Sequence, residues 1–253
     1  MATQHRGEEY LKNVTAKLAA VESKQAKLIS QAGAMMADAC QQDRLIHVYG
    51  GGGHTVMMVC EMFFRAGGLA NINPIFGHDI SPLCQALKYL EIERTTGYGA
   101  CLIRYYNLVK DDLLIIFHNI GYNPTTIDAA MEAKKRGAKI IAISSHHWRD
   151  KLPRDHHTRH PSKKHLFEFA DLCIDDENPF GDSDFLVAGC DVPIGPTSTI
   201  VDAYIAQRLI IEAVAEMVRR GMRPPVFLSA NLPRGDEENA ELLAKYRNRV
   251  KNL

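Results

Sequence analysis

The sequence has no net charge and no long apolar run. Its 253 residues include 30 basic and 30 acidic side chains, so no global field favours nucleic acid or an anionic membrane. No stretch approaches the roughly 18 uninterrupted apolar residues of a membrane span, and the N-terminal MATQHRGEEYLKN places charges where a signal peptide needs an apolar core. We therefore expect no nucleic-acid partner and no membrane association.

Cysteine is scarce, and its spacing forms no metal-binding or redox motif. The six cysteines are widely spread and none forms a C-x-x-C pair. Several lie inside apolar runs, where a reduced thiol behaves as a small hydrophobic side chain. Because this usage is typical of a reducing compartment, we expect a cytoplasmic protein.

Nucleotide-binding fingerprints are missing as well. A dinucleotide-binding turn needs G-x-G-x-x-G, and in the glycine-rich stretch at 50–53 its last glycine would fall on Thr55 or Val56. No Gly-Lys-Ser/Thr follows, which excludes a Walker loop. We expect neither a dinucleotide nor another bound cofactor.

What the sequence does contain is a series of short apolar runs that lead through glycine or polar residues into helical patterns. The runs are LIHVY, LLIIF and KIIAIS, followed by a shorter one, DLCID. Continuous rather than alternating hydrophobicity is typical of parallel strands buried on both faces. We predict an α/β fold in which helices cover both faces of a parallel sheet, with functional residues at the carboxyl ends of the strands.

Helical periodicity dominates both ends of the chain. From Glu8 to Cys40 apolar residues recur every three or four positions, which predicts an amphipathic helix of about 50 Å. One subunit of this size seldom covers such a length, so we expect a homodimer or homotetramer. A second long helix is expected from Thr197 to Gly221, and a helix of about twelve residues in the tail.

These elements divide the chain into three parts within one structural domain. Residues 1–43 are expected to form a helical extension, residues 44–223 the α/β domain, and residues 224–253 a C-terminal tail with its own helix. An apolar content of 46% is enough for one core of this size. No internal repeat or low-complexity linker interrupts the chain.

The first strand-to-helix junction, YGGGGHT, is the most glycine-rich part of the chain. Four consecutive glycines let backbone amides approach a ligand closely, and the start of a helix adds partial positive charge. Together they suit an anion or a sugar oxygen. Thr55 equally fits a helix N-cap, with the glycines forming only a tight turn, and the two roles are compatible.

Two further junctions place polar residues at the same expected edge of the sheet. In FHNIGYN, Asn119 and Asn123 offer amide donors and acceptors, and Gly121 permits an unusual backbone angle. In AISSHH, Ser144 and Ser145 follow the third apolar run. The three junctions predict a ligand site, and a purely structural turn is the alternative for the second one.

As a whole, the chain resembles the SIS (sugar isomerase) family, and within it the bacterial branch described as phosphosugar isomerases. The resemblance extends from about residue 8 to residue 247. It implies a flavodoxin-like fold with a five-stranded parallel sheet that binds phosphosugars. The segments that carry it are GGGHT (51–55), FFRAGGLANINPI (63–75), FHNIGYN (117–123), GPTST (195–199), PPVFLSAN (224–231) and GDEEN (235–239).

The resemblance also implies ligand-binding positions, with one departure. In SIS domains a glycine-rich loop that ends in Ser or Thr closes on the phosphate, and a second loop, Ser-x-Ser-Gly-x-Thr/Asn, supplies two serine hydroxyls. His118 and Ile120 stand in place of those serines, which removes two donors worth about 1.5–3 kcal/mol each toward a charged acceptor, unless a protonated His118 replaces one. The implied substrate-binding residues are Gly51, Gly53, Thr55, His118, Asn119, Gly121, Asn123, Ser144, Ser145, Thr197, Ser198 and Thr199.

Moving a carbonyl between the first two carbons of a sugar needs a base beside the carbonyl and a group that shuttles protons between the two oxygens. Glu61, six residues past Thr55, and His54, in the loop itself, are the catalytic candidates. A solvated helix carboxylate and a loop histidine bonded to backbone are the alternatives. Further candidates are Glu93, Asp79 and the tail residues Asn231, Asp236 and Asn239.

Six histidines gather with several basic residues between positions 146 and 165. A metal would need three or four ligands in fixed geometry, and His156 and His160 supply two only if the segment is helical. We expect no bound metal. A solvated surface loop and a basic lid over an anionic substrate are the other interpretations.

These observations predict a protein that binds a phosphosugar or a related anionic sugar derivative and interconverts its aldose and ketose forms. Because two serines of the second loop are replaced, we hypothesise that the ligand differs from common phosphosugars at its anionic or reacting end. A non-catalytic sugar-phosphate sensor is one alternative. A lyase or deaminase acting on an amino sugar, as in related SIS proteins, is the other.

Overall fold

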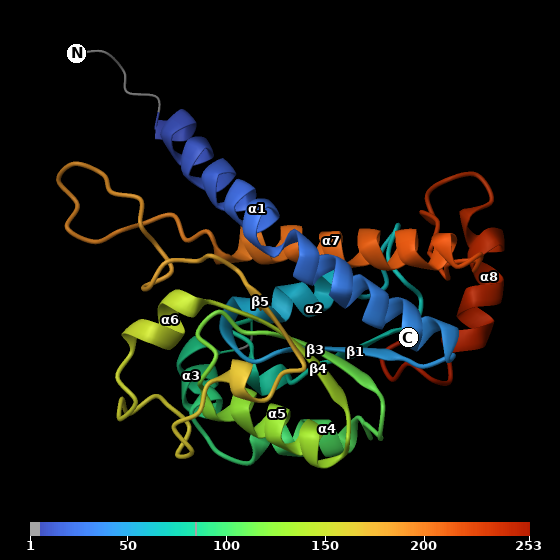
Figure 1. Ribbon diagram of the computed structural model, residues 1–253, viewed down its shortest axis with the longest axis horizontal. Helices are drawn as coiled ribbons and strands as arrows, with labels where there is room; N and C mark the ends of the chain where they lie inside the picture. The colour runs from blue at the N-terminus through green and yellow to red at the C-terminus, as the bar shows by residue number, and fades with distance from the viewer. Residues whose placement is uncertain (1–5, 84) are drawn as a thin grey trace.

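The computed structural model describes residues 6–83 and 85–253, and it confirms the predicted α/β fold (Figure 1). One parallel sheet contains β1 (Ile46–Gly50), β2 (Ile72–Ile75), β3 (Leu113–Phe117), β4 (Lys139–Ser144) and β5 (Leu172–Asp175). The strand order is β2-β1-β3-β4-β5, and each neighbouring pair runs in the same direction. The carboxyl ends of the strands therefore meet at one edge of the sheet.

The long helices lie where the periodicity of the sequence predicts them. They are α1 (Arg6–Gln41), α2 (Val56–Met62), α3 (Ala86–Glu93), α4 (Tyr98–Tyr105), α5 (Pro124–Lys135), α6 (His146–Lys151), α7 (Ser198–Arg219) and α8 (Gly235–Tyr246), with single 3₁₀ turns η1 (Gly53–Thr55), η2 (His78–Ile80) and η3 (Leu166–Glu168). The 36 residues of α1 correspond to about 54 Å. No helix in residues 6–83 or 85–253 is long and apolar enough to cross a bilayer.

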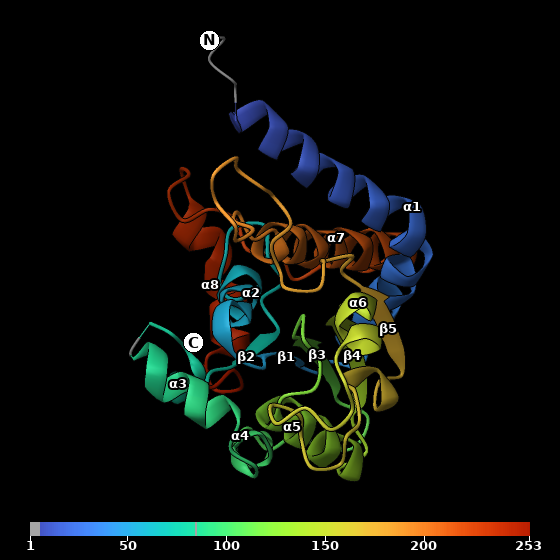
Figure 2. The same cartoon turned by 90° about the vertical axis from the view of Figure 1, so that its left-hand side faces the viewer.

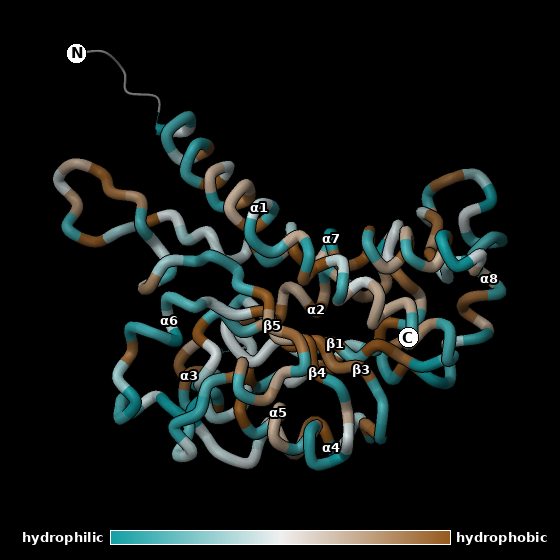
Figure 3. The backbone as a smooth tube through the Cα atoms, in the orientation of Figure 1, coloured by the Kyte–Doolittle hydropathy of each residue, from teal (hydrophilic) through white to brown (hydrophobic). Residues whose placement is uncertain are grey.

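The central strands are buried along their whole length because helices cover both faces. All five residues of β1 and of β3 are inaccessible to solvent, and the apolar colouring of Figure 3 concentrates at the centre of the sheet. Strand β2 was not among the apolar runs, because its sequence is only INPI. Pro74 cannot donate a ladder hydrogen bond and is tolerated here since β2 is an edge strand that pairs only with β1.

One face of the sheet is covered by α1, α2 and α7 (Figure 2). Ile29 and Met36 of α1 and Val201 and Leu209 of α7 are fully buried in the same apolar cluster as the strand residues that point toward them. Ion pairs hold the two long helices together at their outer surfaces, for example between Arg208 Nε and Glu22 Oε1 at 2.5 Å. The predicted long helices therefore form one layer of the domain.

The opposite face is covered by α4 and α5 (Figure 2). Ile103 of α4 and Ile127 and Ala130 of α5 are buried against Ile116 and other strand residues of that face. Helix α3 lies beyond α4 at the edge of this layer and ends at Glu93, beside the carboxyl edge of the sheet. Helix α3 does not follow a strand directly, and yet this placement brings its last residue close to the strand ends.

Two C-terminal segments fold back on the body. Residues 224–228 pair with residues 67–70, through the Leu69–Val226 bridge, and lead into α8. The segment 176–197 leaves β5, projects outward in Figure 1 and returns to α7. It contacts the N-terminal half of α1, where Asn13 Nδ2 donates to Asp184 Oδ1 at 2.8 Å.

Candidate functional site

A cavity of about 470 Å³ opens at the carboxyl edge of the sheet. Its volume lies in the range of small-molecule sites. The loops after β1 and β3, the end of α3, the region of α6 and the start of α7 all contribute to it. It is lined by Gly52, Gly53, His54, Thr55, Tyr89, Leu90, Glu93, Arg94, His118, Asn119, Ile120, Tyr122, Asn123, Trp148, Leu152, His156, Thr158, Asp182 and Ser198.

The glycine-rich loop after β1 is packed too closely for larger residues. A Cβ on Gly51 would lie 1.9 Å from Thr126 Oγ1, and Gly52 has a φ of 150° and faces the carboxylate of Glu93. The hydroxyl of Thr55 donates to Gly52 O at 2.5 Å and makes no cap hydrogen bond to α2. Thr55 therefore closes the loop on itself, and its proton is already engaged.

A buried carboxylate and a buried imidazole face each other in the cavity lining. Glu93 is 4% exposed and His118 is 2% exposed, and Glu93 Oε1 lies 3.4 Å from His118 Nε2. His118 Nδ1 accepts the Gly121 N–H at 2.8 Å, which places the proton of the neutral ring on Nε2, toward Glu93. The amide of Asn123 also donates to Glu93 Oε1, while no described residue donates to Oε2.

Several polar atoms of the lining are buried without a partner among the described residues. They are Asn123 Oδ1, Trp148 Nε1 and Asp182 Oδ1. An unsatisfied buried polar group destabilises a protein by about 1–3 kcal/mol, so several around one cavity indicate a site prepared for a polar ligand. Two acceptors and one donor suit a molecule that carries hydroxyl groups.

Aromatic side chains form one wall of the cavity. Trp148 and Tyr122 make an edge contact with centroids 6.4 Å apart, and Phe180 packs against Trp148 at 4.5 Å. The guanidinium of Arg159 lies 4.4 Å from the centre of the Tyr122 ring and fixes it from behind. A rigid aromatic surface beside convergent polar groups is typical of small-molecule sites and fits the apolar face of a sugar.

Behind the β3 loop, two fully buried carboxyl groups contact Asn119. Its Nδ2 donates to Asp176 Oδ2 at 2.7 Å and to Asp202 Oδ2 at 2.8 Å. Burial raises the pKa of both carboxyls, that of Asp176 to about 7, and the charge of Asp176 further raises the pKa of Asp202. Nearby His165 is 3% exposed, and burial lowers its pKa to about 3, so this ring stays neutral.

The structure brings most of the predicted ligand-binding residues together. Gly53, Thr55, His118, Asn119, Asn123 and Ser198 line the cavity, as does the catalytic candidate His54. A second group supports the loops from behind: Ser144 Oγ donates to Asn119 O at 3.0 Å, Ser145 Oγ donates to Asn178 O at 2.6 Å, and Thr197 Oγ1 donates to Asn178 Oδ1 at 3.2 Å. The residues that support the site without lining it are Gly51, Gly121, Ser144, Ser145 and Thr197.

Glu61 and Thr199 lie outside the cavity lining. Glu61 Oε1 accepts from Gln207 at 2.7 Å, and its Oε2 pairs with Arg65 one turn along α2. Among the further candidates, Asp79 pairs with Lys88, and Asn239 binds the backbone of Leu228, away from the cavity. Of all the carboxylates weighed, Glu93 is the one placed in the lining.

Sequence reasoning missed several residues of the site. Trp148 is the single tryptophan of the chain, and Asp182 lies in a segment without periodicity. Asp202 left a signal, because it falls on the buried stripe of α7 among Ser198, Val201 and Ile205. An acid on the apolar face of a helix indicates a buried interaction, and this pattern would have singled it out.

The histidine-rich segment is anchored to the body of the domain. Residues 156–160 are not helical, and His160 Nε2 lies 3.2 Å from Asp128. His156 lines the cavity, and His165 caps η3. Within residues 6–83 and 85–253, no three histidine, cysteine, aspartate or glutamate side chains gather in a way that could hold a metal ion.

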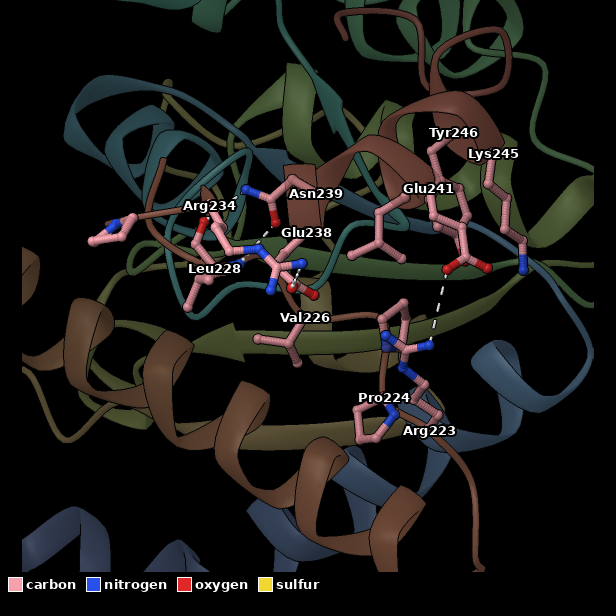
Figure 4. Close-up of a pocket in the computed structure, with 13 residues that line it drawn as sticks. Arg223, Pro224, Val226, Leu228, Arg234, Glu238, Asn239, Glu241, Lys245 and Tyr246 are labelled. Atoms are coloured by element: carbon pink, nitrogen blue, oxygen red, sulfur yellow. Dashed lines mark hydrogen bonds and ion pairs between the residues drawn. The ribbon is translucent and has the colours of Figure 1, made fainter. Parts of the chain in front are cut away.

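A second cavity, of about 480 Å³, lies between residues 223–228 and α8 (Figure 4). Its charged groups pair with one another: Arg223 lies 3.9 Å from Glu241, and Arg234 lies 3.2 Å from Glu238. Proline, leucine and valine make up much of the remaining wall. This cavity lacks the buried unpartnered polar atoms that mark the first one among the described residues.

A parallel sheet in this order, with a glycine-rich loop and a polar second loop at its carboxyl edge, is the arrangement of a sugar isomerase domain. The chain belongs to the SIS-domain family, whose pattern matches residues 9–145. A UPF0309 protein from Thermoanaerobacter pseudethanolicus is 34% identical over 249 residues, which cover 97% of this chain and 99% of the relative.

Solved structures share the fold at low sequence identity. A phosphoheptose isomerase from Francisella tularensis has a TM-score of 0.54 and 14% identity, covering 85% of this chain and 100% of its own. The phosphoheptose isomerase GmhA from Neisseria gonorrhoeae has a TM-score of 0.55 and 13% identity, covering 84% of this chain and 98% of its own. At this identity the likeness concerns the fold.

Proposed function

We propose that the protein binds a sugar derivative with an anionic group in the cavity at the carboxyl edge and interconverts its aldose and ketose forms. The observation that carries the proposal is the pairing of buried Glu93 with buried His118 in the cavity lining. The SIS family and the phosphoheptose isomerases that share its fold support the same class of reaction.

Glu93 is the proposed base. Its Oε1 is held by Asn123 and faces His118, which leaves Oε2 for the ligand. The carboxylate takes the proton from the carbon next to the carbonyl, and the electron pair of that bond forms the double bond of an enediol. The same carboxyl then returns the proton to the former carbonyl carbon.

His118 is the proposed proton shuttle between the two oxygens. Its Nε2–H, fixed by the bond from Gly121 to Nδ1, donates to the carbonyl oxygen as the enediol forms. The imidazolate left by this donation then takes the proton of the neighbouring hydroxyl, which restores the neutral ring, and the carbonyl re-forms one carbon away. No net proton is gained or lost over the cycle.

The other lining residues are proposed to contact different parts of the ligand. Arg94 supplies the positive charge for the anionic group, and His54 of the glycine-rich loop offers a ring nitrogen as a hydrogen-bond donor. Trp148 and Tyr122 are placed for the apolar face of the sugar, and the unpartnered atoms of Asn123 and Asp182 for its hydroxyls. This assignment leaves the proton chemistry to Glu93 and His118.

Three variants test the base. Glu93→Gln keeps the acceptor for Asn123 but removes the basic oxygen, so turnover should fall by about 100- to 10,000-fold while binding persists. Glu61→Gln tests the other carboxylate, and Glu91→Gln, exposed on the same helix α3, is the matched control. The carboxylate whose loss stops turnover with binding intact is the base, and normal turnover in Glu93→Gln would remove Glu93 from the mechanism.

The reaction itself is tested by incubating the protein with sugar phosphates and sugar sulfonates and following them by NMR. Aldose–ketose conversion supports the proposal. Line broadening of a ligand without conversion would identify a sensor, and release of an amine or an eliminated group would identify a deaminase or lyase. Either of those outcomes would overturn the isomerase assignment.

A further inference from the structure

The carboxamide of Asn119 is locked in one orientation. Both hydrogens of its Nδ2 are directed to carboxyl oxygens, at 2.7 Å from Asp176 and 2.8 Å from Asp202. Its backbone carbonyl accepts from Ser144 Oγ and from Ser145 N, each at 3.0 Å. A reversed amide would bring Oδ1 against two carboxyl groups, so the observed orientation is the one that the surroundings permit.

This orientation makes Asn119 an acceptor toward the cavity. Asn119 lines the cavity, and no described residue donates to its Oδ1. Asn123 is 5% exposed; its Nδ2 donates to Glu93 Oε1, and its Oδ1 is buried without a partner. Asp182 adds a third unpartnered acceptor to the lining. Asn119, Asn123 and Asp182 thus offer acceptors beside the β3 loop, and an oxyanion brought against these three atoms would be repelled.

The two carboxyls behind Asn119 maintain the lock. Asp176 is 0% exposed and Asp202 is 1% exposed, and burial raises the pKa of both, with the charge of Asp175 adding to the rise for Asp176 and that of Asp176 to the rise for Asp202. At neutral pH at least one of these two buried carboxyls therefore keeps its proton. The other charged groups that face the pair are Asp182, from the segment after β5, and Asp175, which is itself paired with His146 at 2.9 Å.

We propose that the loop at 118–123 is a subsite for hydrogen-bond donors of the ligand, its hydroxyl groups, and not for its anionic group. Asn119 is the specificity-determining acceptor, and Asp176 and Asp202 are positioning residues that act through it. The inference rests on the proposed function, because it assumes a sugar derivative in this cavity. The anionic group then lies at the opposite loop, near Arg94 and His54.

The test compares two probes on the full-length protein by isothermal titration calorimetry. Glucose 6-phosphate reports on the whole site, and inorganic phosphate reports on the anion subsite. Asn119→Ala should weaken glucose 6-phosphate by about tenfold, the effect of one lost hydrogen bond, and leave inorganic phosphate within twofold. Asn248→Ala, exposed after α8, is the matched control and should change neither affinity.

The outcomes separate this inference from the proposed function. Equal weakening of both probes by Asn119→Ala, or tighter binding of glucose 6-phosphate, would make the loop an anion site and overturn the inference alone. No change in either affinity would overturn it as well. A wild-type protein that binds none of the sugar phosphates and sugar sulfonates would overturn the proposed function, and this inference with it.

A second variant tests the positioning role by its pH profile, which a purely structural role would not alter. In the wild type, glucose 6-phosphate affinity should fall from pH 6 to pH 8.5, because two ionised carboxylates repel each other and move away from Asn119. Asp202→Asn should keep the pH 6 affinity within about threefold and flatten that fall, since an amide cannot ionise. The ionisation of the probe is common to both proteins and cancels. Parallel profiles would overturn the role of Asp202.

Discussion

Replacing Asp202 by asparagine should change the pH dependence of folding stability in a direction that the structure fixes. The pair formed with Asp176 is fully buried, and both groups hydrogen-bond the same amide nitrogen. Burial raises the pKa of Asp176 from 3.8 to about 7, and it also raises the pKa of Asp202. The folded protein therefore keeps a proton that the unfolded chain has already lost.

The sign and size of the effect follow from this difference in bound protons. A raised pKa in the folded state gives stability that is complete below pH 3.8 and is lost as the pH rises toward about 7. One such proton corresponds to a loss of about 1.4 kcal/mol per pH unit, or about 3 kcal/mol between pH 5 and pH 7. Asp202→Asn removes the buried carboxyl of Asp202 and with it a loss of this size, while burial keeps the pKa of Asp176 raised in both proteins.

Urea unfolding followed by circular dichroism at pH 5, 6 and 7 measures the effect. The difference in unfolding free energy should shift in favour of Asp202→Asn by about 3 kcal/mol across this range. Other titrating groups, including His165 with its lowered pKa, contribute equally to both proteins and cancel. Asp191→Asn, exposed in the projecting segment, is the control and should follow the wild type. Parallel curves for Asp202→Asn and wild type would refute the proton that we assign to Asp202.

Two further predictions concern the site loop and the core. Gly51→Ala should lower the stability by about 1–3 kcal/mol in thermal unfolding, because its Cβ would lie 1.9 Å from Thr126 Oγ1. Adding Thr126→Ala should restore part of the loss, and an unchanged melting temperature in Gly51→Ala would contradict the close packing. Ile29→Ala, in the fully buried contact between α1 and α7, should lower the free energy of unfolding by about 2–5 kcal/mol in urea, whereas Leu11→Ala, 64% exposed on the same helix, should stay within about 0.5 kcal/mol. Equal effects of the two α1 variants would show that the packing of α1 does not contribute to stability.

The fold could be predicted from the sequence because local apolar patterns report burial directly. Continuous runs such as LLIIF identify strands covered on both faces, and the period of α1 and α7 identifies long helices. Strand β2 was not predicted from its own residues, because INPI is short and contains Pro74; its position is determined by pairing with β1. A four-residue edge strand carries too little local pattern to stand out.

The sequence by itself placed the ligand loops, since glycine and polar residues at strand ends mark them, and the parallel sheet brings those ends to one edge. Tertiary structure alone decided which groups face each other there. Glu93 sits at the end of α3, far from any strand in sequence, and reaches His118 because α3 packs beside the edge and Gly52 has no side chain to exclude it. Asp202 and Asp176 meet at Asn119 from three different elements. Burial and distance, which set the charge state of these groups, are properties of the packed chain and cannot be read from the order of its residues.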